Sequence, residues 1–464
     1  MKGINIKNIF KIKVKRSMMI LITSIVLIYL LVSLYFINHF FFNTVINGVD
    51  LSLKAHSDSD DIFKGYINEY ELHLIERNGE TEKITAKDIE MLYNKKNSIY
   101  KIYNIQISFK WIYSFFNDQK YYVKDLFIYN NNKLNNKINV LNCLNKEIIE
   151  PKDVSFKYLN GSYKIIKEVN GNKINKDKLI EMIKMSILQG ETYLDLNKND
   201  CYYNPRYTII SDKTIETMNL LNKYVKAKIT YIFGSENEIL DGNITNEWFS
   251  VNENLDVIIN ETNVIGYVRS LGKKYDTVGT ARNFKTSTNK IVEVTGGLYG
   301  WKINATDESK ALLENIKRGE IIEKEPIYIQ KAISRDKDEI GNTYVEINIT
   351  KQHLWFYKNG KLITQGNIVT GNPNKGNSTK LGIYMLNYKQ KWVTLIGEDY
   401  EAKVNYWMPF YGNIGIHDAS WRYSFGKEIY KRNGTHGCVN VPLYLAKIIF
   451  ENIEEGIPII VYEE

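Results

Sequence analysis

The sequence contains little cysteine and little histidine. Its 464 residues include six histidines and three cysteines, Cys143, Cys201 and Cys438. Three cysteines are too few for a disulfide framework, which excludes the class of domains held together mainly by disulfides. Cys143 and Cys201 could pair in an exported protein, and Cys438 would then remain as a free thiol.

Charge is missing from one long stretch, and acidic charge is missing from the start of the chain. No charged residue occurs between Ser17 and Val49, and positions 1–16 carry six basic residues and no acidic one. The formal net charge of the chain is +8, and subtracting the +6 of this segment leaves +2 for all other residues. A nearly neutral bulk argues against a nucleic-acid partner, whereas a basic flank is typical of a membrane segment.

The uncharged stretch predicts a transmembrane anchor over residues 17–38. Ser17–Ile37 is dense in Ile, Leu, Met and Val, and as a helix it would span roughly 31 Å, about one bilayer core. No small-residue cleavage pattern follows it, which favours an uncleaved single-pass anchor over a signal peptide. Because the basic cluster comes first, residues 1–16 are expected to form a cytoplasmic tail and the remainder to be exported.

Residues 50–325 predict α+β modules with an internal repeat. Lys83–Leu92 resembles Lys173–Ile183. Thr85 and Asn175, within these segments, are good N-cap residues, and an apolar helical face follows each. A strand–turn–helix unit is therefore expected to occur twice.

The C-terminal residues 342–464 predict a mostly-β domain. Asn359-Gly360 has the sequence of a two-residue hairpin turn between strand-like segments. One helix is expected over Leu443–Ile453, where apolar residues recur with helical spacing. Ile457–Tyr462 is expected to form the closing strand.

The candidate chemistry lies near the end of this domain, where a cysteine and two histidines fall close together. Cys438 would be the nucleophile, and a thiol of ordinary pKa needs a neighbouring imidazole to take its proton. His417 is favoured as this base over His436, because it comes from another segment and can approach across a cleft. Asp418 is expected to orient His417 through its main-chain carbonyl, since the carboxylate of an adjacent residue generally points away. Main-chain N–H groups of His436, Gly437 and Cys438 are expected to form an oxyanion hole.

Two other interpretations of these residues remain open. Each side chain could be a buried structural residue. Alternatively, His417, His436, Cys438 and Asp418 are ligand types that suit zinc, although no paired spacing such as C-x-x-C is present.

Part of the middle region resembles a known module. Tyr275–Gly319, which includes Tyr275-Asp276-Thr277 and Tyr299-Gly300-Trp301, and Lys167–Pro205 are similar to the peptidoglycan-binding module that precedes catalytic domains in cell-wall enzymes. This resemblance implies that the middle region faces the cell wall.

The candidate active-site stretch carries a stronger resemblance. Ile414-Gly415-Ile416-His417-Asp418-Ala419 is followed by Thr435-His436-Gly437-Cys438-Val439-Asn440, with 17 residues between His417 and Thr435. This pattern resembles the signature of L,D-transpeptidases of the YkuD type, and the similarity extends over about Tyr344–Tyr462. One departure is Lys380, where the family commonly has proline after a threonine; this position is expected to lie away from the chemistry.

The resemblance implies a fold and a set of site residues. The C-terminal domain would be a YkuD-like β-sandwich, which joins the N-terminal transmembrane helix and the α+β middle modules that the residue patterns predict. The implied roles are a nucleophile, Cys438; a proton donor and acceptor, His417, oriented by the carbonyl of Asp418; a pocket and oxyanion hole, His436 and Gly437; and substrate-binding residues, Asn440, Thr435 and Tyr406.

The resemblance also implies a reaction. A peptidoglycan stem peptide would be joined to a neighbouring stem through a cysteine thioester, giving 3–3 cross-links, with no metal or organic cofactor. Carbapenems could acylate the same sulfur. Two alternatives remain: an L,D-carboxypeptidase that uses water as the acceptor, and a non-catalytic wall-binding scaffold. The protein would sit in the cytoplasmic membrane with its C-terminal domains facing the wall.

Overall fold

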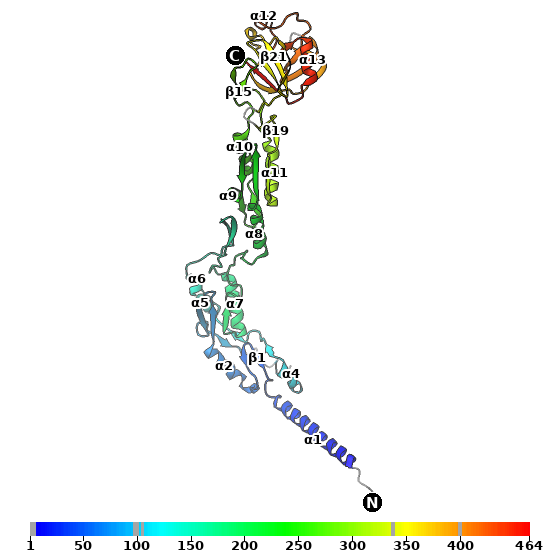
Figure 1. Ribbon diagram of the computed structural model, residues 1–464. Helices are drawn as coiled ribbons and strands as arrows, with labels where there is room; N and C mark the ends of the chain where they lie inside the picture. Colours follow the sequence, from blue (N-terminus) through cyan, green and yellow to red (C-terminus); the bar gives the residue numbers. More distant parts are fainter. Residues whose placement is uncertain (1–5, 96–101, 104–105, 336–338, 398–400) are drawn as a thin grey trace. The chain divides into compact units, whose positions relative to one another are not determined.

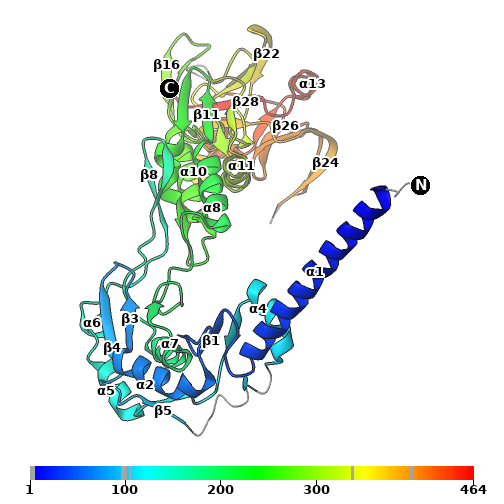
Figure 2. The same ribbon diagram turned by 90° about the horizontal axis from the view of Figure 1, so that it is seen from below.

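The computed structural model describes residues 6–95, 102–103, 106–335, 339–397 and 401–464. The chain divides into two compact units, which are described separately. One unit comprises residues 1–155 and 166–211, and the other comprises residues 156–165 and 212–464 (Figures 1 and 2).

The first unit begins with a long apolar helix, α1 (Ile6–Tyr35). Its segment Lys13–Tyr35 has a mean hydropathy of 2.5 and is almost entirely unburied. By length and composition the helix could cross a membrane, a property that membrane anchors and signal sequences share. It begins earlier than the predicted anchor because the basic segment before Ser17 is also helical.

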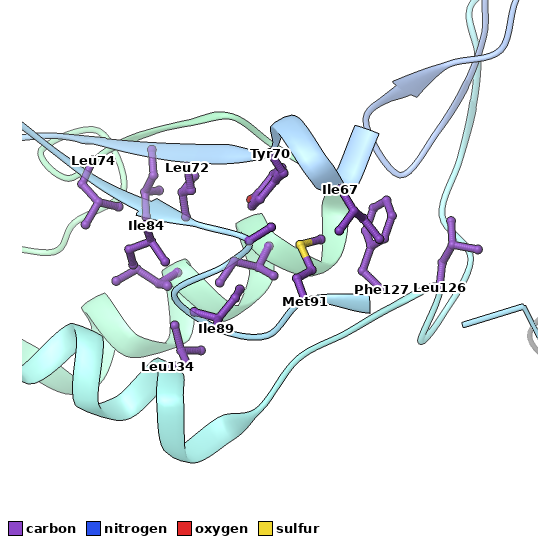
Figure 3. Packing of buried hydrophobic residues seen from close by; sticks show 14 of the residues in the cluster. Ile67, Tyr70, Leu72, Leu74, Ile84, Ile89, Met91, Leu126, Phe127 and Leu134 are labelled. Atoms are coloured by element: carbon purple, nitrogen blue, oxygen red, sulfur yellow. The ribbon is translucent and has the colours of Figure 1, made fainter. Parts of the chain in front are cut away.

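The rest of the first unit is a mixed module. Its elements are β1 (Thr44–Ile46), β2 (Val49–Asp50), η1 (His56–Asp58), α2 (Ser59–Glu69), β3 (Glu71–Ile75), β4 (Thr81–Thr85), β5 (Leu92–Tyr93), η2 (Ser108–Lys110), α4 (Trp111–Phe116), β6 (Gln119–Tyr121), β7 (Phe127–Ile128), α5 (Asn131–Asn139), α6 (Asn142–Asn145), α7 (Lys176–Gln189) and β10 (Tyr193–Asp195). Strand β3 pairs antiparallel with β4 and parallel with β10. Figure 3 shows the core of the module, where side chains of α2, β3 and β4 meet, among them Ile67, Leu72 and Ile84.

The second unit contains another mixed module followed by the C-terminal domain. The module comprises β8 (Ser155–Leu159), β9 (Ser162–Ile166), α8 (Asp212–Val225), β11 (Lys228–Phe233), β12 (Glu236–Leu240), α9 (Gly242–Thr245), η3 (Asn246–Trp248), β13 (Phe249–Val251), β14 (Val257–Ile259), α10 (Glu261–Tyr275), β15 (Arg282–Lys285), β16 (Ile291–Val294), β17 (Lys302–Ile303), α11 (Ala305–Arg318), β18 (Ile321–Lys324) and β19 (Tyr328–Gln330). Strand β11 pairs antiparallel with β12 and parallel with β18. This is the same pattern as β4-β3-β10 in the first module.

The two modules are therefore repeats, but α7 corresponds to α11 and not to the segment after Thr85. Helices α7 and α11 are both 14 residues long, and the side chains of Asn175 and Asn304 accept hydrogen bonds at their N-termini. Each helix ends at a glycine in the left-handed conformation, Gly190 or Gly319. The sequence Lys-Ile-Asn that precedes α7 recurs before α11.

The helix expected after Thr85 is absent, and this part of the prediction is wrong. The chain forms a turn there, because the main-chain N–H of Thr85 donates to Asp88 Oδ2 (2.9 Å) and that of Asp88 donates to Thr85 Oγ1 (3.2 Å). These two bonds are those of a helix start. The backbone then leaves the helical region at Glu90, where φ is 53°.

The C-terminal domain is a two-sheet β-structure with one long helix, labelled by β21 and α13 in Figure 1. Its elements are β20 (Tyr344–Asn348), β21 (His353–Lys358), β22 (Lys361–Asn367), η4 (Pro373–Lys375), β23 (Gly382–Met385), β24 (Gln390–Ile396), β25 (Glu401–Tyr411), β26 (Ile414–Asp418), α12 (Ile429–Asn433), β27 (Val439–Val441), α13 (Leu443–Asn452) and β28 (Pro458–Tyr462). The sheets have the orders β22-β21-β20-β28-β23 and β24-β25-β26-β27. Asn359 and Gly360 both have positive φ (50° and 75°), as a type I′ hairpin turn requires, and confirm the predicted hairpin.

The core of this domain is formed between the two sheets and α13. Val345 and Ile459 come from one sheet, Met408 and Val439 from the other, and Ile449 from α13. The sheet β24-β25-β26-β27 and the loop that precedes β27 carry the candidate site residues.

Candidate active site

Strand β26 carries His417, and Cys438 directly precedes β27, so that the two residues lie on one face of the sheet. The strands run parallel, with His417 opposite Asn440. Because alternate residues of a strand point to the same face, Cys438 shares the face of Asn440 and therefore that of His417. The neighbouring strand β25 places Trp407 opposite His417.

Both residues line one cavity of about 420 Å³. Thr435, His436 and Asn440 also line it, so the structure brings together five of the eight residues that the sequence singled out. The remaining lining residues are Leu395, Glu401, Ala402, Lys403, Trp421, Arg422 and Gly434.

The Cys438 thiol is buried, with 8% of the residue exposed. It lies in an apolar cluster with Val404 and Trp407, and its Sγ is 3.6 Å from the carbonyl oxygen of Asn413. Burial raises the pKa of the Cys438 thiol to about 11, although a hydrogen bond from the main chain of Gly415 acts in the opposite direction. At neutral pH the sulfur therefore holds its proton.

The His417 imidazole is also buried, and its orientation is fixed. Its Nδ1 lies 2.9 Å from the main-chain oxygen of Asp418, the contact that the sequence predicted. A carbonyl only accepts, so Nδ1 carries the proton and Nε2 is left with a lone pair. Burial lowers the pKa of His417; the hydrogen bond to the Asp418 carbonyl and the charge of the Asp418 carboxylate oppose this shift, and the positive charge of Arg422 adds to it. The ring is therefore neutral at pH 7 and can act as a base.

The Asp418 carboxylate is fully buried and is bound to strand β25. It accepts hydrogen bonds from the main-chain N–H groups of Asn405 and Tyr406 (2.8 Å each) and from the side-chain amide of Asn405 (2.7 Å). These bonds occupy the carboxylate. The zinc interpretation needed it as a ligand, so the geometry gives that interpretation no support.

Thr435 fixes the loop that carries the thiol. Its hydroxyl donates to the carbonyl of Cys438 (2.6 Å) and accepts from the N–H of Gly437 (3.0 Å). The Gly437 N–H is thus already engaged, and Gly437 does not line the cavity. The predicted oxyanion hole of main-chain N–H groups at His436, Gly437 and Cys438 therefore stays a prediction, and at Gly437 the hydroxyl of Thr435 already accepts this bond. The glycine is required for backbone shape instead: its φ is 122°, and a Cβ would lie 3.0 Å from Ile414.

Two further expectations need correction. Tyr406 does not line the cavity: it is adjacent to Trp407 and therefore faces the other side of the sheet, where its ring centroid lies 5.1 Å from that of Phe450. The segment around Lys380 is not remote from the site. The hydroxyl of Thr379, the residue before Lys380, donates to the carbonyl of Gly437 (2.7 Å), next to the thiol.

Residues 342–461 match the YkuD family model, described as the L,D-transpeptidase catalytic domain. Residues 82–194 and 207–321 match PG_binding_4, a domain family named for peptidoglycan binding. A solved structure of Enterococcus faecium L,D-transpeptidase, a cysteine-to-serine mutant, is 32% identical; the match covers 54% of this chain and 100% of that one, with a TM-score of 0.44. The chain belongs to the L,D-transpeptidase family.

Two other solved structures are similar to this L,D-transpeptidase family member. The catalytic domain of the E. faecium enzyme acylated by ertapenem is 38% identical over 26% of this chain and 98% of that one, with a TM-score of 0.25. A structure described as an avibactam carbamoyl enzyme is 32% identical over 54% of this chain and 99% of that one, with a TM-score of 0.44. No curated protein matches the chain. The two PG_binding_4 matches are two copies of one module, but both arms of the predicted repeat fall within the first match, so the predicted repeat unit is wrong.

Two cavity residues carry buried polar atoms with no hydrogen-bond partner in the part of the chain that the structure describes. These atoms are Oδ1 of Asn440, an acceptor, and Nε of Arg422, a donor. The Arg422 guanidinium also donates to the carbonyl of Asn433 (2.7 Å), and burial lowers its pKa. Sequence reasoning missed Arg422, because it lies in the unpatterned segment between His417 and Thr435 and no spacing marks it.

Proposed function

We propose that this protein is a peptidoglycan L,D-transpeptidase that forms 3–3 cross-links through a thioester on Cys438. The observation that carries the proposal is the position of His417 and Cys438 on one sheet face, lining one cavity, with the imidazole held by the Asp418 carbonyl. Membership of the L,D-transpeptidase family supplies the reaction class.

In the first step, His417 acts as a general base towards the thiol. Because burial keeps the thiol protonated, Nε2 takes the proton as Sγ attacks the carbonyl carbon before the terminal D-alanine of a tetrapeptide stem. The carbon–nitrogen bond then breaks, and the imidazolium returns the proton to the leaving amine. D-Alanine departs, and the shortened stem remains as a thioester on Cys438.

In the second step, a side-chain amine of a neighbouring stem attacks the thioester. His417 takes the amine proton and returns it to the departing sulfur, which restores the thiol. The new amide joins two third-position residues. Both steps balance with the two stems alone.

The unpartnered atoms of Asn440 and Arg422 are the groups that we propose hold the donor stem. A stem peptide offers amide N–H groups, which suit Asn440 Oδ1, and carboxylates, which suit a guanidinium. Both atoms are buried without a partner among the described residues, so a ligand group that pairs with them would remove the cost of their desolvation.

The proposed setting is the outer face of the cytoplasmic membrane. Helix α1 would be a single-pass anchor, and the basic residues before it would remain inside. The two modules would then lie between membrane and wall. Their family is named for peptidoglycan binding, which agrees with this location.

The test is a product analysis with a disaccharide-tetrapeptide and the full chain. The wild type should release D-alanine and yield dimers, whereas Cys438→Ala and His417→Ala should yield neither. A carbapenem should add one mass equivalent to the wild type and none to Cys438→Ala. The double variant Cys143→Ala/Cys201→Ala is the matched control and should react normally. Tripeptide without dimer would identify a carboxypeptidase, and an adduct on Cys438→Ala would refute the thioester.

A further inference from the structure

A group of exposed aromatic and aliphatic side chains lies beside α1 in the first unit. We call it the aromatic shelf: Phe109 of η2 and Ile112, Tyr113, Phe115 and Phe116 of α4. All five are large and exposed, and Phe116 and Tyr113 reach 79% and 65% exposure. A contiguous apolar surface of this kind is costly in water and marks a site of contact.

The shelf contacts the C-terminal part of α1 through a hydrogen bond and aromatic rings. The Tyr29 hydroxyl donates to the carbonyl of Phe109. Trp111 is the first residue of α4, and the centroid of its ring lies 5.8 Å from that of Tyr29 and 6.2 Å from that of Phe36. Figures 1 and 2 both draw α4 beside the end of α1. The segment therefore turns back along the helix.

The contacts on α1 set the depth of the shelf. The apolar span of α1 ends at Tyr35, and Tyr29 precedes it by six residues, which is about 9 Å along a helix axis. If this span fills the hydrocarbon core, the contact at Tyr29 lies about 9 Å inside its outer edge and the contact at Phe36 lies at that edge, so the shelf occupies the outermost part of the core. Trp and Tyr side chains, here Trp111 and Tyr113, are typical of the outer edge of a span.

Charge and continuity favour lipid over a protein partner. From Gln106 to Asn117 the only charged residue is Lys110, and no acidic residue occurs. The C-terminal part of α1, to which this segment is bound, also exposes large apolar side chains, such as Leu31 and Leu34. A soluble partner would have to cover both surfaces, whereas one bilayer covers them together.

We infer that the aromatic shelf is a second membrane-contact element, which lies in the outer leaflet and fixes the first module at the membrane surface. The inference rests on the proposed role of α1 as an anchor. In this arrangement α1 sets the position across the bilayer, and the shelf restricts tilting of the module about the end of the helix.

The test places a fluorophore at single cysteines in the full chain, reconstituted in lipid nanodiscs. The native cysteines are first replaced by alanine. An environment-sensitive dye is then attached at Phe116→Cys or Tyr113→Cys on the shelf, at Val26→Cys within α1, or at Val140→Cys. Val140 is 70% exposed and lies in the same unit but outside the shelf, so it is the matched control. Brominated lipid and aqueous iodide are the two quenchers.

We expect brominated lipid to quench most of the emission at 116, 113 and 26, and iodide to quench it at 140. Lipid quenching of the dye at position 26, together with iodide quenching at positions 116 and 113, would overturn the inference that the shelf contacts lipid. It would leave the proposal that α1 is a membrane anchor intact. Protection from both quenchers at 116 and 113 would indicate a protein cover and would also overturn the inference. Iodide access at all positions would refute the anchor and the shelf together.

Discussion

The ionisation state of Cys438 gives the most direct prediction about the site. Burial raises its pKa to about 11, against an ordinary value of 9.0. Two units correspond to a roughly 100-fold smaller thiolate fraction at pH 7, or ~2.7 kcal/mol. Cys438 should therefore rest as a thiol beside a neutral His417, and not as a preformed thiolate–imidazolium pair.

Alkylation measures this state. Iodoacetamide reacts with the thiolate, so the rate at Cys438 should rise about tenfold for each pH unit from 6 to 10, without a plateau. Peptide mass spectrometry separates Cys438 from the other two cysteines, which are also buried. Ser235→Cys, in the exposed turn between β11 and β12, supplies a reference thiol of ordinary pKa in the same molecule.

The shape of the profile decides the question, because limited access lowers every rate equally but leaves the slope unchanged. The reference thiol should level off near its ordinary pKa while Cys438 continues to rise. A plateau for Cys438 at or below pH 7 would show that the thiolate forms in the empty site. The concerted proton transfer to His417 would then be refuted.

Three further predictions concern neighbouring groups. Acylation by a carbapenem requires a neutral His417 imidazole, and burial lowers the pKa of this imidazole. The acylation rate should therefore increase with pH to a plateau, with a midpoint below 6.5. Stopped-flow measurements at several pH values would show this profile. Gly437→Ala introduces a Cβ 3.0 Å from Ile414 at a φ of 122° and should slow acylation about tenfold or more. Gly360→Ala is the control, because Gly360 also has a positive φ but has open space around it, and this variant should acylate at the normal rate. Asp418→Ala leaves buried N–H groups of β25 without an acceptor and should destabilise the C-terminal domain by roughly 3 kcal/mol. Calorimetry would show this loss as a lower melting temperature. Asp418→Asn keeps one acceptor oxygen and should lower the stability less.

The sequence predicted those parts of the fold that depend on neighbouring residues. The Asn359-Gly360 turn and the helix that begins at Leu443 were both predicted, because each is encoded in a few adjacent positions. The turn at Thr85 shows the limit of such signals. Its reciprocal bonds with Asp88 are those of a helix start, yet no helix follows, because side chains after it enter the core of the module instead. A local start signal does not determine whether the helix continues.

The direction in which each candidate residue points depends on strand pairing, which the sequence does not display. His417 and Cys438 reach one cavity because β26 and β27 pair in a particular parallel register; a shift of one residue would place them on opposite faces. The same alternation removes Tyr406 from the site and brings Trp407 into it. A spacing can therefore nominate residues for a reaction, but the pairing of β25, β26 and β27 determines which of them reach the cavity. The segment between His417 and Thr435 is the extreme case, because no sequence pattern marks any of its residues. Arg422 lies in this segment, and it is identified only because it lines the cavity.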